Sequence, residues 1–183
     1  NLNLKDFKQW VASKHLEENK NFIDVHWEGK ENGRTIESVI NTQIVHMNRY
    51  AKMYSKSAIH DSSFSVQEDF IYLINLKAFG AMTKMQLIKK NIHEKPIGMQ
   101  IINRLIDAGY IEQKPSLTDK RSKMIQITTE GINALESIMS KIRKATHIVT
   151  GDLETSEKME LYRLLNKLDT FHKPVYNGHY ETQ

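Results

Sequence analysis

The sequence predicts a mostly α-helical fold that contains one small β-hairpin. Apolar residues recur at helical spacing over residues 36–59 and again beyond residue 130. Between these stretches, residues 65–79 are apolar on nearly every side, which is typical of a helix buried at the centre of a fold. Two short strand-like runs, 110–115 and 124–128, flank a charged connection and indicate a hairpin with an extended tip.

The long helices are predicted at the two ends of the chain. Residues 130–149 and 156–171 each carry an apolar face, and from Pro174 onward we expect a loosely held tail. Before residue 36, we expect a short amphipathic helix over residues 4–18 and then a polar loop. The apolar stripe of the helix over 36–59 consists of Ile36, Ile40, Ile44, Met47, Ala51 and Tyr54.

Capping signals divide the middle of the chain into shorter helices. We expect Ser65 to cap the central helix, with Glu68 as its capping-box partner, and Gly80 to end it. Thr83 is a good N-cap for a helix over residues 84–90.

The next helix follows His93-Glu94 and ends at Gly109, with Pro96 in its first turn, where proline is tolerated. The order helix, turn, helix, strand, charged tip, strand is that of a winged helix-turn-helix. Such a helix fits the major groove of duplex DNA, and the tip can reach the minor groove or the phosphate backbone.

Four residues of this helix suit DNA recognition. Lys95 and Gln100 can offer donors to base edges, and Ile97 can contact a thymine methyl group. We expect Gly98 to let the helix backbone approach the DNA closely. The alternative interpretation of Lys95 and Gln100 is an ordinary solvated helix face.

The positive charge of the chain is concentrated in this region. Residues 82–129 hold nine basic and four acidic side chains, a net charge of +5, whereas the whole chain carries +4. A basic stripe favours a nucleic-acid partner, although a solvated basic face would give the same composition.

Other classes of function lack support in the sequence. The chain has no cysteine, its eight histidines are scattered, and no nucleophile–base motif or phosphate-binding loop occurs. We therefore expect no enzyme activity, no cofactor and no metal site. No apolar run approaches a membrane span or a signal peptide, so we expect no membrane partner and a cytoplasmic location.

Three runs of residues resemble the MarR family of winged-helix regulators, over roughly residues 36–171. The family pattern is a helix that ends in glycine, a wing with Asp-x-Arg, and Thr-x-x-Gly at the start of a long helix. The matching runs here are 106–112 (IDAGYIE), 119–123 (DKRSK) and 127–131 (ITTEG).

The resemblance implies a homodimer that binds a pseudo-palindromic operator as a transcriptional regulator, in most cases a repressor. It implies modulation by a small aromatic or phenolic ligand between the dimerisation and DNA-binding parts. Residues 1–33 would then form an N-terminal extension, 34–62 and 130–175 the dimerisation region, 63–129 the DNA-binding region, and 176–183 the tail.

The resemblance also places the DNA-binding residues. By position, Arg121 is the wing-tip arginine and Asp119 the acid that orients the wing; taken without this context, the two residues would indicate a turn that holds an exposed ion pair. The complete predicted set is Thr83, Lys84, Lys95, Pro96, Ile97, Met99, Gln100, Arg104, Asp119, Lys120, Arg121 and Lys123.

The start of the predicted recognition helix departs from the family pattern. The family usually has small hydroxylated residues there, whereas this chain has Glu94, Lys95, Pro96 and Gly98. Because Glu94 would repel phosphate, a second hypothesis is a protein-interaction or scaffold module whose DNA binding is weak or lost.

Overall fold

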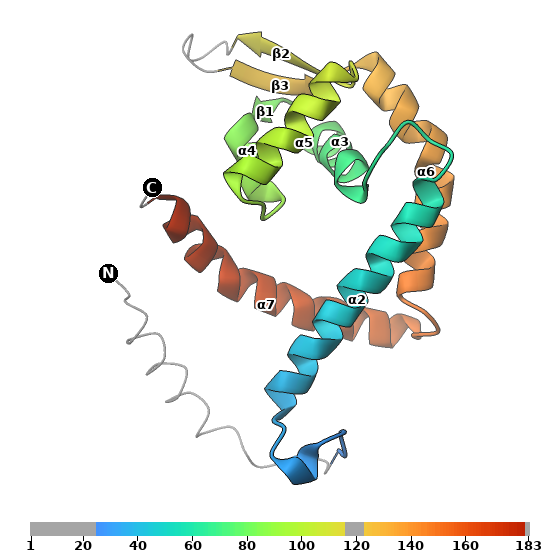
Figure 1. Cartoon of the computed structure of the whole chain (residues 1–183), viewed down its shortest axis with the longest axis vertical. Coiled ribbons are helices and arrows are strands. Elements are labelled where there is room, and N and C mark those ends of the chain that lie inside the picture. The colour runs from blue at the N-terminus through green and yellow to red at the C-terminus, as the bar shows by residue number, and fades with distance from the viewer. Residues whose placement is uncertain (1–24, 116–122, 182–183) are drawn as a thin grey trace. The chain divides into compact units, whose positions relative to one another are not determined.

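The computed structural model describes residues 25–115 and 123–181 (Figure 1). The chain divides between Val45 and His46 into two compact units. The expected helix over residues 4–18 lies outside the described residues.

The described part of the first unit contains a tight turn and the start of a long helix. Gly29 and Gly33, both in the left-handed region, flank the 3-10 helix η1 (Lys30–Asn32). The indole N–H of Trp27 donates to the carbonyl of Arg34 at 2.7 Å, which closes the turn. Helix α2 (Ile36–Ile59) begins immediately after it and has the bounds that its apolar stripe predicts.

The second unit holds a winged helix-turn-helix (Figure 1). Its central helix is α3 (Gln67–Phe79), followed by α4 (Lys84–Lys90) and α5 (Lys95–Asp107). Strands β2 (Ile111–Pro115) and β3 (Lys123–Ile127) form the predicted hairpin, with Ile111 opposite Ile127 and Pro115 opposite Lys123. The sequence did not predict the two-residue strand β1 (Met82–Thr83), which pairs with β3 and gives the sheet order β1-β3-β2.

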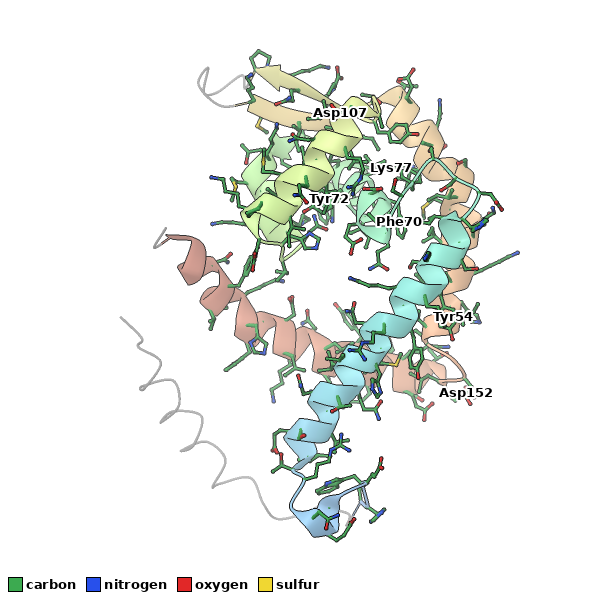
Figure 2. All side chains as sticks on the ribbon, in the orientation of Figure 1. Tyr54, Phe70, Tyr72, Lys77, Asp107 and Asp152 are labelled. Carbon is green, nitrogen blue, oxygen red and sulfur yellow. The ribbon has the colours of Figure 1, made fainter. Side chains whose placement is uncertain are left out.

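Apolar side chains from α3, α4, α5 and the sheet meet in one core. Figure 2 shows Phe70 and Tyr72 on the central helix, and both side chains are buried. Helix α6 (Thr129–Val149) adds Leu135, Ile138 and Ile142 to this core. The predicted fold class, mostly helical with a small hairpin, is confirmed.

The start of α3 corrects one prediction. The helix begins at Gln67. The carboxylate of Asp69, and not the predicted pair Ser65 and Glu68, accepts the free backbone N–H groups at the start of the helix. Asp69 Oδ2 accepts the backbone N–H groups of Ser65 at 3.0 Å and Val66 at 3.2 Å. A sequence search for a capping box selects Ser65 because it cannot show which acidic side chain points inward.

The end of the last helix corrects a second prediction. Helix α7 (Thr155–Glu181) runs past Phe171 and continues through Pro174, where a loosely held tail was expected. A proline costs a helix one hydrogen bond and bends it, but the helix can resume on the far side. Residues 176–181 are therefore helical.

Candidate nucleic-acid interface

The predicted recognition helix, α5, begins where its local sequence dictates. Glu94 is extended and precedes Lys95, and Pro96 occupies the first turn, where its missing N–H costs nothing. The helix ends at Asp107 with Ala108 as its C-cap, and Gly109 follows with φ +75°, a conformation that glycine adopts without strain.

The two faces of α5 have different chemistry. Ile101, Ile102 and Leu105 are buried in the core. Lys95 in the first turn and Gln100 in the second are exposed to solvent, and Ile97 is 48% exposed. A cation, an amide and an aliphatic side chain therefore share an accessible helix end, which is the chemistry that base edges in a major groove require.

Pro96 and Met99 complete this helix end. Pro96 is exposed, whereas Met99 is half-buried and packs against the core. Roles in DNA binding for both residues stay predictions.

Gly98 corrects the expectation of a close approach to DNA. It is buried, and a Cβ atom at this position would lie 2.4 Å from Cγ1 of Ile88, whose side chain is itself fully buried. The missing side chain lets α5 pack tightly on α4. Gly98 therefore fixes the recognition helix against its supporting helix, and it faces away from the surface that α5 presents.

Arg104 has a partner inside the fold. Its Nε donates to Oδ1 of Asp69 at 2.9 Å, and its Nη2 donates to the same oxygen at 2.5 Å. The Asp69 carboxylate is buried, and its hydrogen-bond donors are this guanidinium and the backbone N–H groups of Ser65 and Val66 just before α3. A DNA-binding role for Arg104 stays a prediction. In the structure its guanidinium joins α5 to α3 through Asp69.

The start of α4 is built as the sequence predicts. Thr83 Oγ1 accepts the backbone N–H of Gln86 at 3.2 Å, and Gln86 Oε1 accepts the backbone N–H of Thr83 at 2.8 Å. This capping box occupies the Thr83 side chain. The neighbouring Lys84 is half-buried.

The hairpin presents charge of both signs. Lys114 Nζ lies 2.9 Å from Glu112 Oε1, and Gln126 Nε2 donates to the same oxygen at 2.7 Å. These two hydrogen bonds hold the pKa of the Glu112 carboxyl below its usual value. Lys123 is exposed at the start of β3, whereas Asp119, Lys120 and Arg121 of the wing tip lie outside the described residues.

The Thr-x-x-Gly motif joins the hairpin to α6. Thr128 Oγ1 accepts the N–H of Gly131 at 3.0 Å and donates to the carbonyl of Gly109 at 2.7 Å. A Cβ atom at Gly131 would lie 2.3 Å from the carbonyl oxygen of Tyr110. The motif therefore ties three elements together, and only glycine fits its last position without a shift of the backbone.

Sequence reasoning missed the contacts that join distant residues to the turn between α4 and α5. Tyr72 Oη lies 2.9 Å from His93 Nδ1, and Tyr176 Oη donates to the carbonyl of His93 at 2.8 Å. Residues 72 and 176 lie 21 and 83 positions from His93, and neither belongs to a local motif that could have indicated the pairing.

A metal site and a membrane span each require a particular set of residues. Within residues 25–115 and 123–181, no group of three or more His, Asp or Glu side chains could hold a metal ion. No helix in this part of the chain combines the length and apolar character that a membrane span requires.

Comparisons with known proteins agree with this geometry. No family model matches the chain. Over 120 residues, 66% of this chain and 75% of the relative, it is 22% identical to the HTH-type transcriptional repressor NicR of Pseudomonas putida.

Solved structures share the fold. BpsR of Bordetella bronchiseptica, whose DNA binding is regulated by 6-hydroxynicotinic acid, matches with a TM-score of 0.67 and 18% identity over 74% of this chain and 96% of its own. A mutant MarR from E. coli in complex with operator DNA matches with a TM-score of 0.66 and 19% identity over 74% of this chain and 99% of its own. The resemblance to MarR regulators is thus confirmed for the fold.

Proposed function

We propose that this chain, whose fold is that of the MarR-type regulators, is a homodimeric transcriptional regulator that binds double-stranded DNA in a sequence-specific manner. The observation that carries the proposal is the first part of α5. It exposes Lys95, Ile97 and Gln100, and at Gly98 it packs closely on the buried Ile88 of α4, beside a β-hairpin. NicR, a transcriptional repressor, and the MarR–operator complex support the same function.

The exposed end of α5 can read base edges in the major groove. A glutamine can bind adenine through two hydrogen bonds, a lysine can donate to the O6 and N7 atoms of guanine, and Ile97 can contact a thymine methyl group. The wing would add contacts to phosphates or the minor groove through Lys123 and the tip residues Lys120 and Arg121.

The apolar faces of the long helices support a homodimer. Within a single chain, α7 exposes large apolar side chains along most of its length, and α2 does the same. Contiguous exposed apolar surface of this kind usually marks an interface. On α7 the exposed apolar residues that share one face are Leu161, Leu164, Leu165, Leu168, Phe171 and Val175, whereas Met159 and Tyr162 lie on the other side of the helix.

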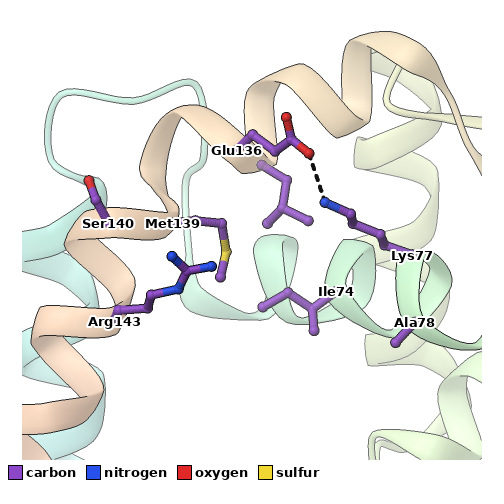
Figure 3. A pocket seen from close by; sticks show the side chains of 8 residues that line it. Ile74, Lys77, Ala78, Glu136, Met139, Ser140 and Arg143 are labelled. Carbon is purple, nitrogen blue, oxygen red and sulfur yellow. Dashed lines mark hydrogen bonds and ion pairs between the residues drawn. The ribbon is translucent and has the colours of Figure 1, made fainter.

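A cavity between α3 and α6 suits the predicted small aromatic ligand (Figure 3). Its volume is about 620 Å³, within the usual range for small-molecule sites. Ile74, Leu135 and Met139 supply apolar lining, and Arg143 supplies a cation for a carboxylate or phenolate. The cavity lies between a helix of the winged domain and a helix of the proposed dimerisation region.

Replacing Lys95 or Gln100 by alanine is expected to weaken binding to a selected operator duplex by about 1–3 kcal/mol for each true base contact. Fluorescence anisotropy with a labelled duplex measures the effect. Lys144→Ala, which removes an exposed lysine from α6, is the matched control and should bind like the wild type. If the Lys95 and Gln100 variants bound the operator as tightly as the Lys144 control, α5 would not be the helix that contacts the bases.

The scaffold hypothesis rests on Glu94, which is exposed at the start of α5 and makes no side-chain cap hydrogen bond. A negative charge there opposes an approaching phosphate. The same anisotropy experiment decides between the two functions, because a scaffold would show no salt-sensitive binding to any duplex.

Filling the cavity should abolish the response to ligand without loss of DNA binding. A thermal-shift screen of aromatic carboxylates, beginning with 6-hydroxynicotinic acid, and of phenols should give a compound that raises the Tm of the wild type. At a concentration of one hundred times Kd, the rise should be about 5–10 °C. Met139→Trp should remove this shift and still bind the operator. The assignment of this cavity as a ligand site would be contradicted if no compound raised the Tm of the wild type. It would also be contradicted if the Tm of Met139→Trp rose by the same amount.

A further inference from the structure

The turn before the recognition helix is held firmly against α3. Tyr72 Oη lies 2.9 Å from His93 Nδ1, and the two rings stack with their centroids 5.8 Å apart. Asn75 Nδ2 donates to Asn91 Oδ1 at 2.9 Å, and Asn91 Nδ2 donates to the carbonyl of Leu87 at 2.7 Å. Two side chains of α3 thus contact the turn, one at each end of it.

The middle residue of this turn is in an uncommon conformation. Ile92 has φ +54°, in the left-handed region that β-branched residues rarely adopt. Its N–H donates to the carbonyl of Lys89 at 3.2 Å, and the N–H of His93 donates to that of Ile88 at 3.3 Å. Such a conformation persists only where the surroundings fix it. The direction in which α5 leaves the turn is therefore set by contacts around it.

Helix α7 supplies a further contact to the same turn. Tyr176 Oη donates to the backbone carbonyl of His93 at 2.8 Å. Among the described residues 159–178, Tyr176 alone is half-buried, and all the others are exposed. After some four turns exposed to solvent, α7 therefore contacts the winged domain through the Tyr176 side chain.

Pro174 lies two residues before this contact. A proline inside a helix removes a backbone hydrogen bond and bends the helix axis. Figure 1 shows the C-terminal part of α7 turning toward the α4–α5 end of the winged domain. The position of Pro174 suits a bend that directs Tyr176 to His93.

We propose that Tyr176 is a positioning residue that ties α7 to the turn before α5 and so holds the recognition helix in one orientation relative to the dimerisation helices. The inference rests on the proposed function. A dimer that binds two half-sites must place its recognition helices about 34 Å apart. A helix that is held there in advance loses less conformational freedom when DNA binds.

The test compares Tyr176→Phe, which removes only the hydroxyl, with Tyr162→Phe on the exposed part of the same helix. Two duplexes are used: an operator selected from a random pool, and the same operator with one base pair inserted between its half-sites. Tyr176→Phe should bind the operator about 2- to 10-fold more weakly, as expected for one lost hydrogen bond. It should also discriminate less between the two duplexes, whereas Tyr162→Phe should match the wild type in both respects.

A measurement without DNA gives an independent readout. Amide hydrogen exchange at residues 91–95 should be faster in Tyr176→Phe and unchanged in Tyr162→Phe. A merely destabilised protein would lose affinity for both duplexes by the same factor, and an unchanged ratio would overturn the positioning role. The positioning role would also be overturned if Tyr176→Phe bound the operator as tightly as the wild type or more tightly, or if its amide exchange were unchanged. Each of these results would leave the proposed function intact. If the wild type bound neither duplex, both the function and this role would fail.

Discussion

Replacing Leu164 and Leu168 of α7 by glutamate is expected to convert the dimer into a monomer and to abolish operator binding. The two side chains are 45% and 42% exposed in the single chain and lie one helical turn apart on the same stripe. Burial of one leucine is worth about 1.5–3 kcal/mol, and a symmetric interface would lose this energy at four positions. The dimer dissociation constant should therefore rise by at least about 10⁴-fold.

Sedimentation equilibrium measures this effect directly. The matched control is Asn166→Glu with Thr170→Glu, which adds the same charge one turn apart on the opposite face of α7, where both residues are also exposed. The control should stay dimeric. Since both leucines lie outside the core, circular dichroism should show that the winged domain of the leucine variant remains folded. A dimeric leucine variant would place the interface elsewhere.

Replacing Gly98 by alanine is expected to destabilise the fold by about 2 kcal/mol and to lower the Tm by about 4–8 °C. The new methyl group would lie 2.4–2.9 Å from three atoms of the Ile88 side chain, and because that side chain is fully buried, a shift to make room would disturb its packing in the core. The gain of about 1 kcal/mol in helix propensity cannot offset this cost. Thermal and denaturant unfolding measure the change.

A double-mutant cycle isolates the cause. Ile88→Ala removes all three atoms that the methyl group would meet, so in that background Gly98→Ala should be neutral or stabilising. Gly178→Ala is the control, because a Cβ atom there meets nothing within 4 Å and the site is inside α7. Equal destabilisation of Gly98→Ala in both backgrounds would show that the contact with Ile88 is not the reason.

The order of the elements could be predicted because several boundaries carry a local signal. Thr83 and Thr128 cap their helices with their own side chains, and Gly80 and Gly109 end theirs with positive φ. The exposed residues Lys95 and Gln100 were also predictable, because the helical period alone separates them from the buried face.

The remaining features depend on distant residues. From the sequence, Arg104 was predicted to bind DNA. The fold instead brings its side chain to Asp69, 35 positions away. Gly98 was expected to make room for DNA, whereas in the fold the side chain of Ile88 occupies the space beside it. The last helix was expected to end near Phe171 because the tail from Pro174 onward is polar and lies at the end of the chain. Only the fold shows that α7 continues and that Tyr176 contacts His93.

Selection of duplexes from a random pool by the purified wild-type chain tests the central proposal most directly. Two identical recognition helices on one dimer predict enrichment of an inverted repeat whose half-sites lie about one helical turn, roughly 10 base pairs, apart. Binding to that repeat should fall steeply as salt is raised. A pool that stays random after repeated rounds, at low salt, would contradict the assignment of this chain as a sequence-specific regulator.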